Sequence, residues 1–226
     1  MMSLSFSSFF WISAVYFYLK YSASIPEYLG IFFLILVMLF MYFINVGIMQ
    51  TKCGSASGSV FQATLLPWLL MFGPMMLALQ YFPQWKNPFS NTLGYMVARL
   101  AGGTQQLLSL LKPGSEVKLH YVYKDPSLLL NQFTTSNFDT VLASFREDME
   151  YTEESKQAFF KIVRLKDLVS EWIWYLLTAS VVISTSYTML MNGECTKTVD
   201  DYVLSHQVAM ADTTEPTPLP LYTVTE

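Results

Sequence analysis

The chain has few charged residues for its length, and this shortage limits what it can be. Lysine, arginine, aspartate and glutamate make up 13% of its 226 residues, about half of the roughly 25% that is usual in soluble domains. The formal net charge is −4, so the chain lacks the strong basic field that nucleic-acid-binding proteins carry. We therefore expect no nucleic-acid partner.

Residue types that carry catalysis or hold metals are also scarce. The two histidines, His120 and His206, lie far apart in the sequence, and the topology argued below would place them on opposite sides of a membrane. The sequence has no Cys-x-x-Cys spacing and no glycine motif of the kind that cradles phosphate groups. We therefore expect no catalytic residue, no metal site and no cofactor, and a protein that is not an enzyme.

Long uncharged runs, in contrast, are abundant. Four ranges contain no charged side chain, namely 1–19, 29–49, 53–85 and 172–193. A helix of roughly 20 apolar residues spans a bilayer core of about 30 Å. The sequence thus predicts an all-α polytopic membrane protein with about four transmembrane helices. A small, mostly helical extramembrane region would lie between spans three and four.

Composition divides the chain into five segments. Residues 1–85 are expected to form transmembrane helices one to three, and residues 86–111 an aromatic turn and an amphipathic helix at the membrane interface. The range 93–111 could instead be a fifth, weaker span. Residues 112–171 are expected to be extramembrane, mostly helical, and to end in a stalk. Residues 172–193 form the last span, and residues 194–226 an extended tail.

The extramembrane region begins with two local patterns. Residues 116–124 alternate apolar and polar side chains, which predicts a single strand that needs a partner strand. The string Ser136-Asn137-Phe138-Asp139 is typical of a capping box that opens a helix. The apolar positions of that helix continue with helical spacing as far as Met149.

A longer helix is predicted from Glu153 onward. Thr152 can cap it, and nothing interrupts its hydrophobic pattern before Asn192 and Gly193, which favour a helix end. One unbroken helix to about Met191 would be about 58 Å long at 1.5 Å per residue. Its first half would stand out of the bilayer as a stalk, and its second half would span.

Positive charge is concentrated on one side of the predicted arrangement. With four spans, all but Lys52 and Lys197 of the 13 lysines and arginines face that side. The positive-inside rule makes this side cytoplasmic and puts both termini across the membrane. Four basic residues before the last span would suit anionic headgroups, with a solvated helix face as the alternative. They are Lys156, Lys161, Arg164 and Lys166.

Several side chains are candidates for particular roles around the membrane. Asn45, the one strongly polar side chain of span two, should face a neighbouring helix rather than lipid. Cys53 follows the second span and Cys195 the fourth, so both fall on one side and a disulfide is allowed but not required. Aromatic residues near span ends are expected at the water–lipid boundary. These are Trp85, Phe89, Tyr95, Trp172 and Trp174.

The end of the tail is rich in proline and acidic or polar residues, and we expect it to be extended. If a neighbouring protein holds it, the tail is a docking peptide. The residues that would dock are Pro216, Pro218, Leu219, Pro220, Leu221 and Tyr222.

The most distinctive local string runs from Trp85 through Lys86-Asn87-Pro88-Phe89-Ser90-Asn91-Thr92-Leu93-Gly94 to Tyr95, directly after a hydrophobic hairpin. With that span arrangement it resembles membrane proteins of large nucleocytoplasmic DNA viruses, which include minor capsid proteins that tie an inner membrane to the outer shell. The resemblance implies a structural protein of the virion, placed in the virion internal membrane or in host endomembrane during assembly. Its partners would be the lipid bilayer, other capsid or membrane-assembly proteins, and further copies of the chain.

A second function is compatible with the same composition. No charged side chain lies inside a predicted span, which argues against ion-coupled transport. A passive channel or viroporin-like oligomer needs no such charge, and Asn45 and Gln62 would then line its pore.

Overall fold

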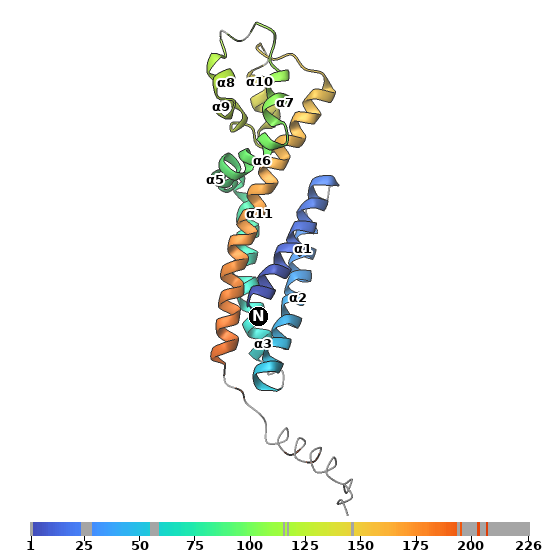
Figure 1. The fold of residues 1–226 in the computed structure, drawn as a ribbon, viewed down its shortest axis with the longest axis vertical. Coiled ribbons are helices and arrows are strands. Elements are labelled where there is room, and N and C mark those ends of the chain that lie inside the picture. Colours follow the sequence, from blue (N-terminus) through green and yellow to red (C-terminus); the bar gives the residue numbers. More distant parts are fainter. Residues whose placement is uncertain are drawn as a thin grey trace, which may run out of the picture.

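A computed structural model describes residues 2–23, 29–54, 59–114, 116, 118–145, 147–193, 195, 203 and 207. Every regular element in these ranges is helical, which confirms the all-α part of the predicted fold class. The molecule is elongated, with a bundle of long helices at one end and a group of short helices at the other (Figure 1). One helix, α11 (Glu153–Asn192), runs through both parts.

The bundle consists of α11 and three further helical segments. These are α1 (Met2–Ser22), α2 (Leu29–Cys53) and a segment made of α3 (Ser59–Pro67), the π-helical turn η1 (Trp68–Phe72) and α4 (Gly73–Tyr81). Pro67 and Pro74 flank this π-turn. Because proline has no N–H to donate, each interrupts the regular hydrogen-bond ladder, and the widened turn between them absorbs the interruption.

Three helical segments are long and apolar enough to cross a membrane: α2, the range 59–81, and α11. The structure is thus compatible with an integral membrane protein. α1 has 21 residues but is not among the three. The predicted count of four spans is therefore not confirmed, although α1 packs along α11 in the same bundle.

Aromatic side chains fill the centre of the bundle. Phe9 of α1 and Phe72 of η1 are completely buried, and their ring centroids lie 5.8 Å apart. Trp68 lies 5.6 Å from Phe9, and Tyr175 of α11 lies 5.1 Å from Phe72. The packing of these large rings fixes α1 against the other segments through close van der Waals and edge-to-face ring contacts, which are what hold helices together in lipid.

The expectation of one continuous helix from about Glu153 is confirmed. α11 has 40 residues, so it is about 60 Å long. Thr152 caps it with a capping box, in which the Ser155 N–H donates to Thr152 Oγ1 (3.2 Å) and the Thr152 N–H donates to Ser155 Oγ (3.0 Å). These bonds satisfy backbone donors that the first helical turn leaves unpaired.

The first half of α11 packs against a group of short helices, which we call the head. Its elements are η2 (Pro83–Lys86), α5 (Asn87–Phe89), η3 (Ser90–Gly94), α6 (Tyr95–Leu100), α7 (Gly103–Ser109), α8 (His120–Lys124), α9 (Ser127–Leu130) and α10 (Phe138–Ser144). The head has a hydrophobic core of its own. This core completely buries Leu110 and Phe133 of the head and Phe159 of α11. α11 therefore contributes to two separate cores, one in the bundle and one in the head.

Two predictions about the head are wrong. Residues 120–124 form helix α8 rather than part of a strand, and no partner strand exists in the described ranges. The alternating pattern was misleading because Leu119 and Val122, three residues apart, both pack on the head core, which is helical spacing. The range 93–111 is not one amphipathic helix either. The range contains η3, α6 and α7, and Gly102 separates α6 from α7. The φ of Gly102 is +87°, which glycine adopts without strain.

The predicted capping box before α10 is also wrong. Asn137 Oδ1 accepts from the Thr134 N–H (2.7 Å), in the turn that precedes the helix, and makes no cap bond into it. The helix ends at Ser144 and does not reach Met149. Met149 instead forms an isolated antiparallel bridge with Leu111, which ties the segment before α11 to the end of α7.

Candidate functional site at the membrane boundary

A charged cluster lies where the bundle meets the head. The Glu171 side chain of α11 is only 8% exposed, and its two carboxylate oxygens bind two lysines. Lys20 Nζ, near the end of α1, lies 2.5 Å from Oε1, and Lys86 Nζ, at the end of η2, lies 3.1 Å from Oε2. One carboxylate thus joins three segments that are separated by 151 and 85 residues in the chain. We call Lys20, Lys86 and Glu171 the boundary triad.

A second carboxylate, one helical turn earlier on α11, joins the head to the same helix. Asp167 Oδ1 accepts from Ser90 Oγ (2.8 Å) in the π-turn η3. Its Oδ2 accepts from the Thr135 N–H (2.7 Å) and from Thr135 Oγ1 (2.9 Å). Because a buried carboxylate is costly without donors, these three bonds account for the presence of Asp167 in an otherwise apolar contact.

Lys166, next to Asp167, is a completely buried lysine. Its Nζ donates to the Leu130 carbonyl (3.3 Å) and lies 3.5 Å from Asn91 Oδ1. Burial lowers the pKa of Lys166 to about 8, against an opposing effect of the nearby Asp167 carboxylate. The head approaches the helix closely here, since a Cβ added at Gly94 would lie 2.5 Å from the Lys166 carbonyl oxygen.

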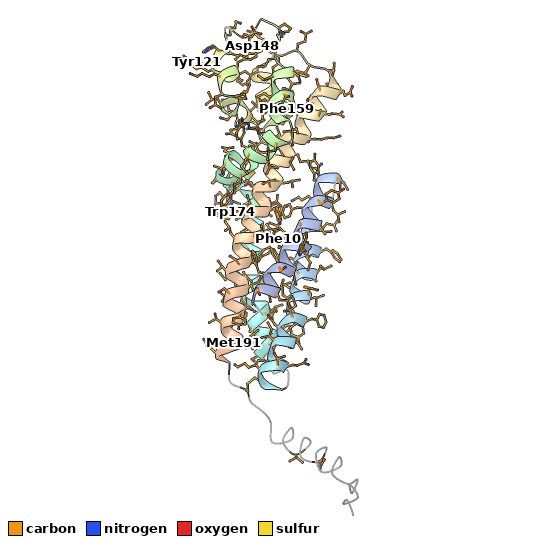
Figure 2. All side chains as sticks on the ribbon, viewed as in Figure 1. Phe10, Tyr121, Asp148, Phe159, Trp174 and Met191 are labelled. Atoms are coloured by element: carbon orange, nitrogen blue, oxygen red, sulfur yellow. A yellow bond between two sulfur atoms is a disulfide. The ribbon has the colours of Figure 1, made fainter. Side chains whose placement is uncertain are left out.

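Tryptophan side chains surround the level of the boundary triad. Trp172 Nε1 donates to Ser13 Oγ (3.0 Å), and Trp174 Nε1 donates to the Trp85 carbonyl (2.9 Å). The ring of Phe89 lies 5.3 Å from that of Trp174, which Figure 2 labels midway along α11. Tryptophan at this position is typical of the membrane–water interface. From Trp172 to Asn192, α11 extends about 31 Å, which matches a bilayer core.

Four of the five aromatic residues predicted at the interface therefore gather at one level of the molecule. The fifth, Tyr95, packs against the head core instead. If α11 crosses a bilayer from Trp172 onward, the boundary triad lies at the edge of the hydrocarbon core and the head lies outside it.

The opposite end of the bundle is tied by a disulfide and a lysine. Cys53 and Cys195 form a disulfide with a Cα–Cα distance of 5.4 Å, which is the pairing that the sequence allowed. Lys52 Nζ donates to the carbonyl oxygens of Leu190 (3.1 Å), Met191 (2.7 Å) and Gly193 (2.8 Å). A cation at the C-terminal end of a helix compensates carbonyl groups that have no intrahelical partner.

Asn45 faces neighbouring helices, as predicted. Its Nδ2 donates to Thr64 Oγ1 (2.8 Å) on α3 and to Ser186 Oγ (3.0 Å) on α11. Gln62, by contrast, is exposed on the outer face of α3. A pore within a single chain would need Asn45 and Gln62 on one lining surface. Asn45 instead lies between helices, and Gln62 lies on the outer face.

The other predicted site residues have varied positions. The docking residues of the tail, from Pro216 to Tyr222, and His206 lie outside the described residues, while His120 is exposed on α8. Of the four basic residues expected to suit headgroups, only Lys161 is simply exposed. Lys156 pairs with Asp139 (2.9 Å), Arg164 Nη2 donates to the Lys20 carbonyl (2.6 Å), and Lys166 is buried. In the described ranges, no three histidine, cysteine, aspartate or glutamate residues come together as a metal site.

Comparison with known proteins adds no identity. No family model, no curated protein and no solved structure matches the chain. The function must therefore be argued from the geometry of the boundary. The sequence reasoning missed the boundary triad because it used charges to bound the spans and to set their orientation, and not to pair one residue with another. The available signal was that all three charged residues directly flank an apolar run.

Proposed function

We propose that this chain is a non-enzymatic integral membrane protein that anchors or organises a protein assembly at a membrane. In its specific form, suggested by the resemblance of the Trp85–Tyr95 string, it is a minor capsid protein that tethers a virion internal membrane, or host endomembrane during assembly, to capsid proteins. The observation that carries the proposal is the single helix α11, which belongs to the cores of both the bundle and the head.

The junction between the two parts supports rigid anchoring. Glu171 and Asp167 together bind donors from α1, η2, η3 and the segment before α10. Several charge-assisted hydrogen bonds from different segments hold the head in one orientation relative to the bundle. A protein that presents a surface at a fixed height above a membrane needs this property, whereas a flexible linker would not provide it.

The outer surface of the bundle supports lipid as its surroundings. Large apolar side chains are exposed along α2, including Phe43 at 68% and Ile31 at 64%. Apolar exposure on this scale is unfavourable in water and ordinary in a bilayer. The charged groups at the boundary, in contrast, are paired with each other, which favours a structural role over a catalytic one.

The pore alternative has less support. Asn45 uses its amide within the chain, and Gln62 lies on another face. Conductance of the protein reconstituted in planar bilayers tests this alternative directly, and we expect no single-channel currents.

Site-specific crosslinking tests the anchoring proposal. A photo-crosslinking amino acid replaces either Tyr121, which is 74% exposed on the head, or Phe43 on the bundle surface, in the full chain within its membranes. We expect protein adducts from position 121, identified by mass, and lipid adducts from position 43. Lipid adducts at position 121 with protein adducts at position 43 would contradict the proposal.

Deletion of residues 212–226 tests the tail separately. We expect the truncated chain to insert into membranes normally, measured by resistance to alkaline carbonate extraction, but to enter the assembly less efficiently. Equal assembly by the truncated chain would exclude tail docking and leave anchoring by the head intact.

A further inference from the structure

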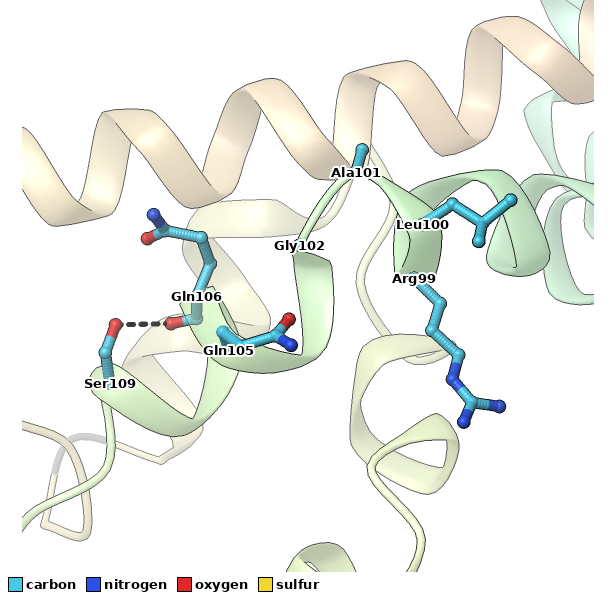
Figure 3. Close-up of a pocket in the computed structure, with 7 residues that line it drawn as sticks. All are labelled: Arg99, Leu100, Ala101, Gly102, Gln105, Gln106 and Ser109. Atoms are coloured by element: carbon cyan, nitrogen blue, oxygen red, sulfur yellow. Dashed lines mark hydrogen bonds between the residues drawn. The ribbon is translucent and has the colours of Figure 1, made fainter.

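A pocket opens in the head at the bend between α6 and α7. Gly102 makes the bend, and the pocket beside it has a volume of about 430 Å³. It is lined by Arg99, Leu100, Ala101, Gly102, Gln105, Gln106 and Ser109. Figure 3 shows the Arg99 side chain extending from α6 and the Gln105 side chain from α7, with Ser109 Oγ bonded to the backbone carbonyl of Gln106.

The chemistry of this pocket suits an anion. Its lining contains one cation and no carboxylate. Arg99 is exposed, and within the described ranges its guanidinium has no ion pair or hydrogen bond. Guanidinium has five N–H donors in a planar fork that matches phosphate oxygens. The Gln105 amide, in the same lining, supplies further N–H donors.

Exposed apolar side chains lie along the segment between the third span and the pocket. Leu93, Met96 and Leu100 have helical spacing along η3 and α6 and are 45%, 53% and 80% exposed. Phe82 and Trp85, at the end of the third span, are also exposed. An apolar face that starts at a span and carries an arginine at its far end is the pattern of a segment lying in the membrane interface.

The height of the pocket above the boundary triad agrees with this placement. Gly94 contacts α11 at Lys166 and Gly103 contacts it at Ile162, five and nine residues before Glu171. These positions are about 8 and 14 Å beyond the triad along the helix. The headgroup layer extends about 5–8 Å beyond the hydrocarbon core, so Gly94 lies at its outer edge and Gly103 beyond it, and Arg99 lies between these two glycines in the chain.

We propose that Arg99, with Gln105, binds the phosphate of an anionic phospholipid from the surrounding membrane, while Leu93, Met96 and Leu100 contact the interfacial part of the same lipid layer. The bilayer, rather than a soluble anion, is the source because the segment that leads from the third span to the pocket carries large exposed apolar side chains, which suit lipid rather than water. The site depends on the membrane placement of the proposed function. It adds a lipid preference that anchoring alone does not require.

Lipid binding by the full chain tests the site. The protein, solubilised in neutral detergent, is titrated with phosphatidic acid and separately with phosphatidylcholine, and bound lipid is measured by native mass spectrometry. We expect tighter binding of phosphatidic acid, and about tenfold weaker binding after Arg99→Gln, because a charge-assisted pair is lost. Arg99→Lys should bind with intermediate affinity, because lysine keeps the charge without the fork.

Lys161→Gln is the matched control, since it removes one exposed cation at a similar height but outside the pocket. We expect it to change phosphatidic acid binding less than twofold. Unchanged binding by Arg99→Gln, or an equal loss in both variants, would overturn the site. Competition by inorganic phosphate as strong as that by the lipid would overturn the lipid as its ligand. Circular dichroism of each variant verifies that helix content is retained.

A spin label at Leu100→Cys measures the placement independently. In vesicles, we expect the label to collide more with dissolved oxygen than with a water-soluble nickel chelate, as interfacial positions do. A label that behaves as fully water-exposed would overturn the apolar contact. Lipid adducts from a photo-crosslinking amino acid at position 43, in the same vesicles, would show that the chain is still inserted in the membrane. The anchoring proposal would then still hold.

Discussion

Replacement of Glu171 by glutamine should destabilise the protein strongly, because it leaves two lysines without their anion. Lys20 and Lys86 keep 27% and 20% of their side-chain surface exposed, so water replaces part of what is lost. Each charge-assisted hydrogen bond contributes about 1.5–3 kcal/mol. Taking the lower end for both because of this exposure gives a loss of about 3 kcal/mol, or more than a hundredfold in the unfolding equilibrium.

The measurement is unfolding by sodium dodecyl sulfate in mixed micelles, followed by tryptophan fluorescence. Trp172 and Trp174 lie beside the boundary triad and report on its opening. Glu150→Gln is the control, because Glu150 is exposed and its side chain has no ion pair in the described ranges. We expect the control to change the free energy of unfolding by less than about 0.5 kcal/mol.

A triple variant separates the charge pairing from the packing. If Lys20, Lys86 and Glu171 are all replaced by methionine, no unpaired charge is left, and the loss should be smaller than for Glu171→Gln alone. A Glu171→Gln protein as stable as the parent would refute the reasoning that this carboxylate holds the three segments together.

Three further predictions concern the same helix and its contacts. The pKa of Lys166 is about 8 when folded and about 10.4 when unfolded, so the unfolded chain binds more protons between these values. The free energy of unfolding should therefore rise from about pH 8 to pH 10 by up to about 3 kcal/mol. In urea titrations, Lys166→Met should remove that part of the rise. A Lys166→Met protein with an unchanged pH profile of stability would contradict this prediction. Gly94→Ala should lower stability by about 1–3 kcal/mol, because its Cβ would lie 2.5 Å from the Lys166 carbonyl. Asn45→Leu should cost about 1 kcal/mol in detergent unfolding, whereas Gln62→Leu, on the exposed face, should be nearly neutral.

Hydropathy predicted the long helices well because their cause is local. Uncharged runs of about 20 residues have few alternatives to a helix in lipid, and the start of α11 is encoded by Thr152 and its neighbours. The bend between α6 and α7 was not predicted, because it depends on the positive φ of Gly102, which the apolar pattern does not show. α8 could not be distinguished from a strand, because five residues are too few for one periodicity to exclude the other.

The boundary triad could not be predicted because its members are brought together only by the fold. Lys20, Lys86 and Glu171 are far apart in sequence, and each by itself is an ordinary charged residue beside a span. Which lysine reaches which carboxylate depends on how α1 crosses α11, and the aromatic packing of Phe9, Trp68 and Phe72 determines that crossing. Such packing has no short-range sequence signal.

Because α11 is one unbroken helix, a change in the angle of its bundle half also moves its head half. The 18 residues from Glu153 to Ser170 extend about 27 Å beyond the boundary. If α11 crosses a bilayer from Trp172 onward, its tilt adjusts to the thickness of that bilayer. A tilt change of about 20°, as large as the average tilt of a transmembrane helix, would move the outer end of α11 sideways by about 9 Å. A thicker or thinner membrane would then reposition the surfaces that the head displays, because α11 is unbroken between the two parts.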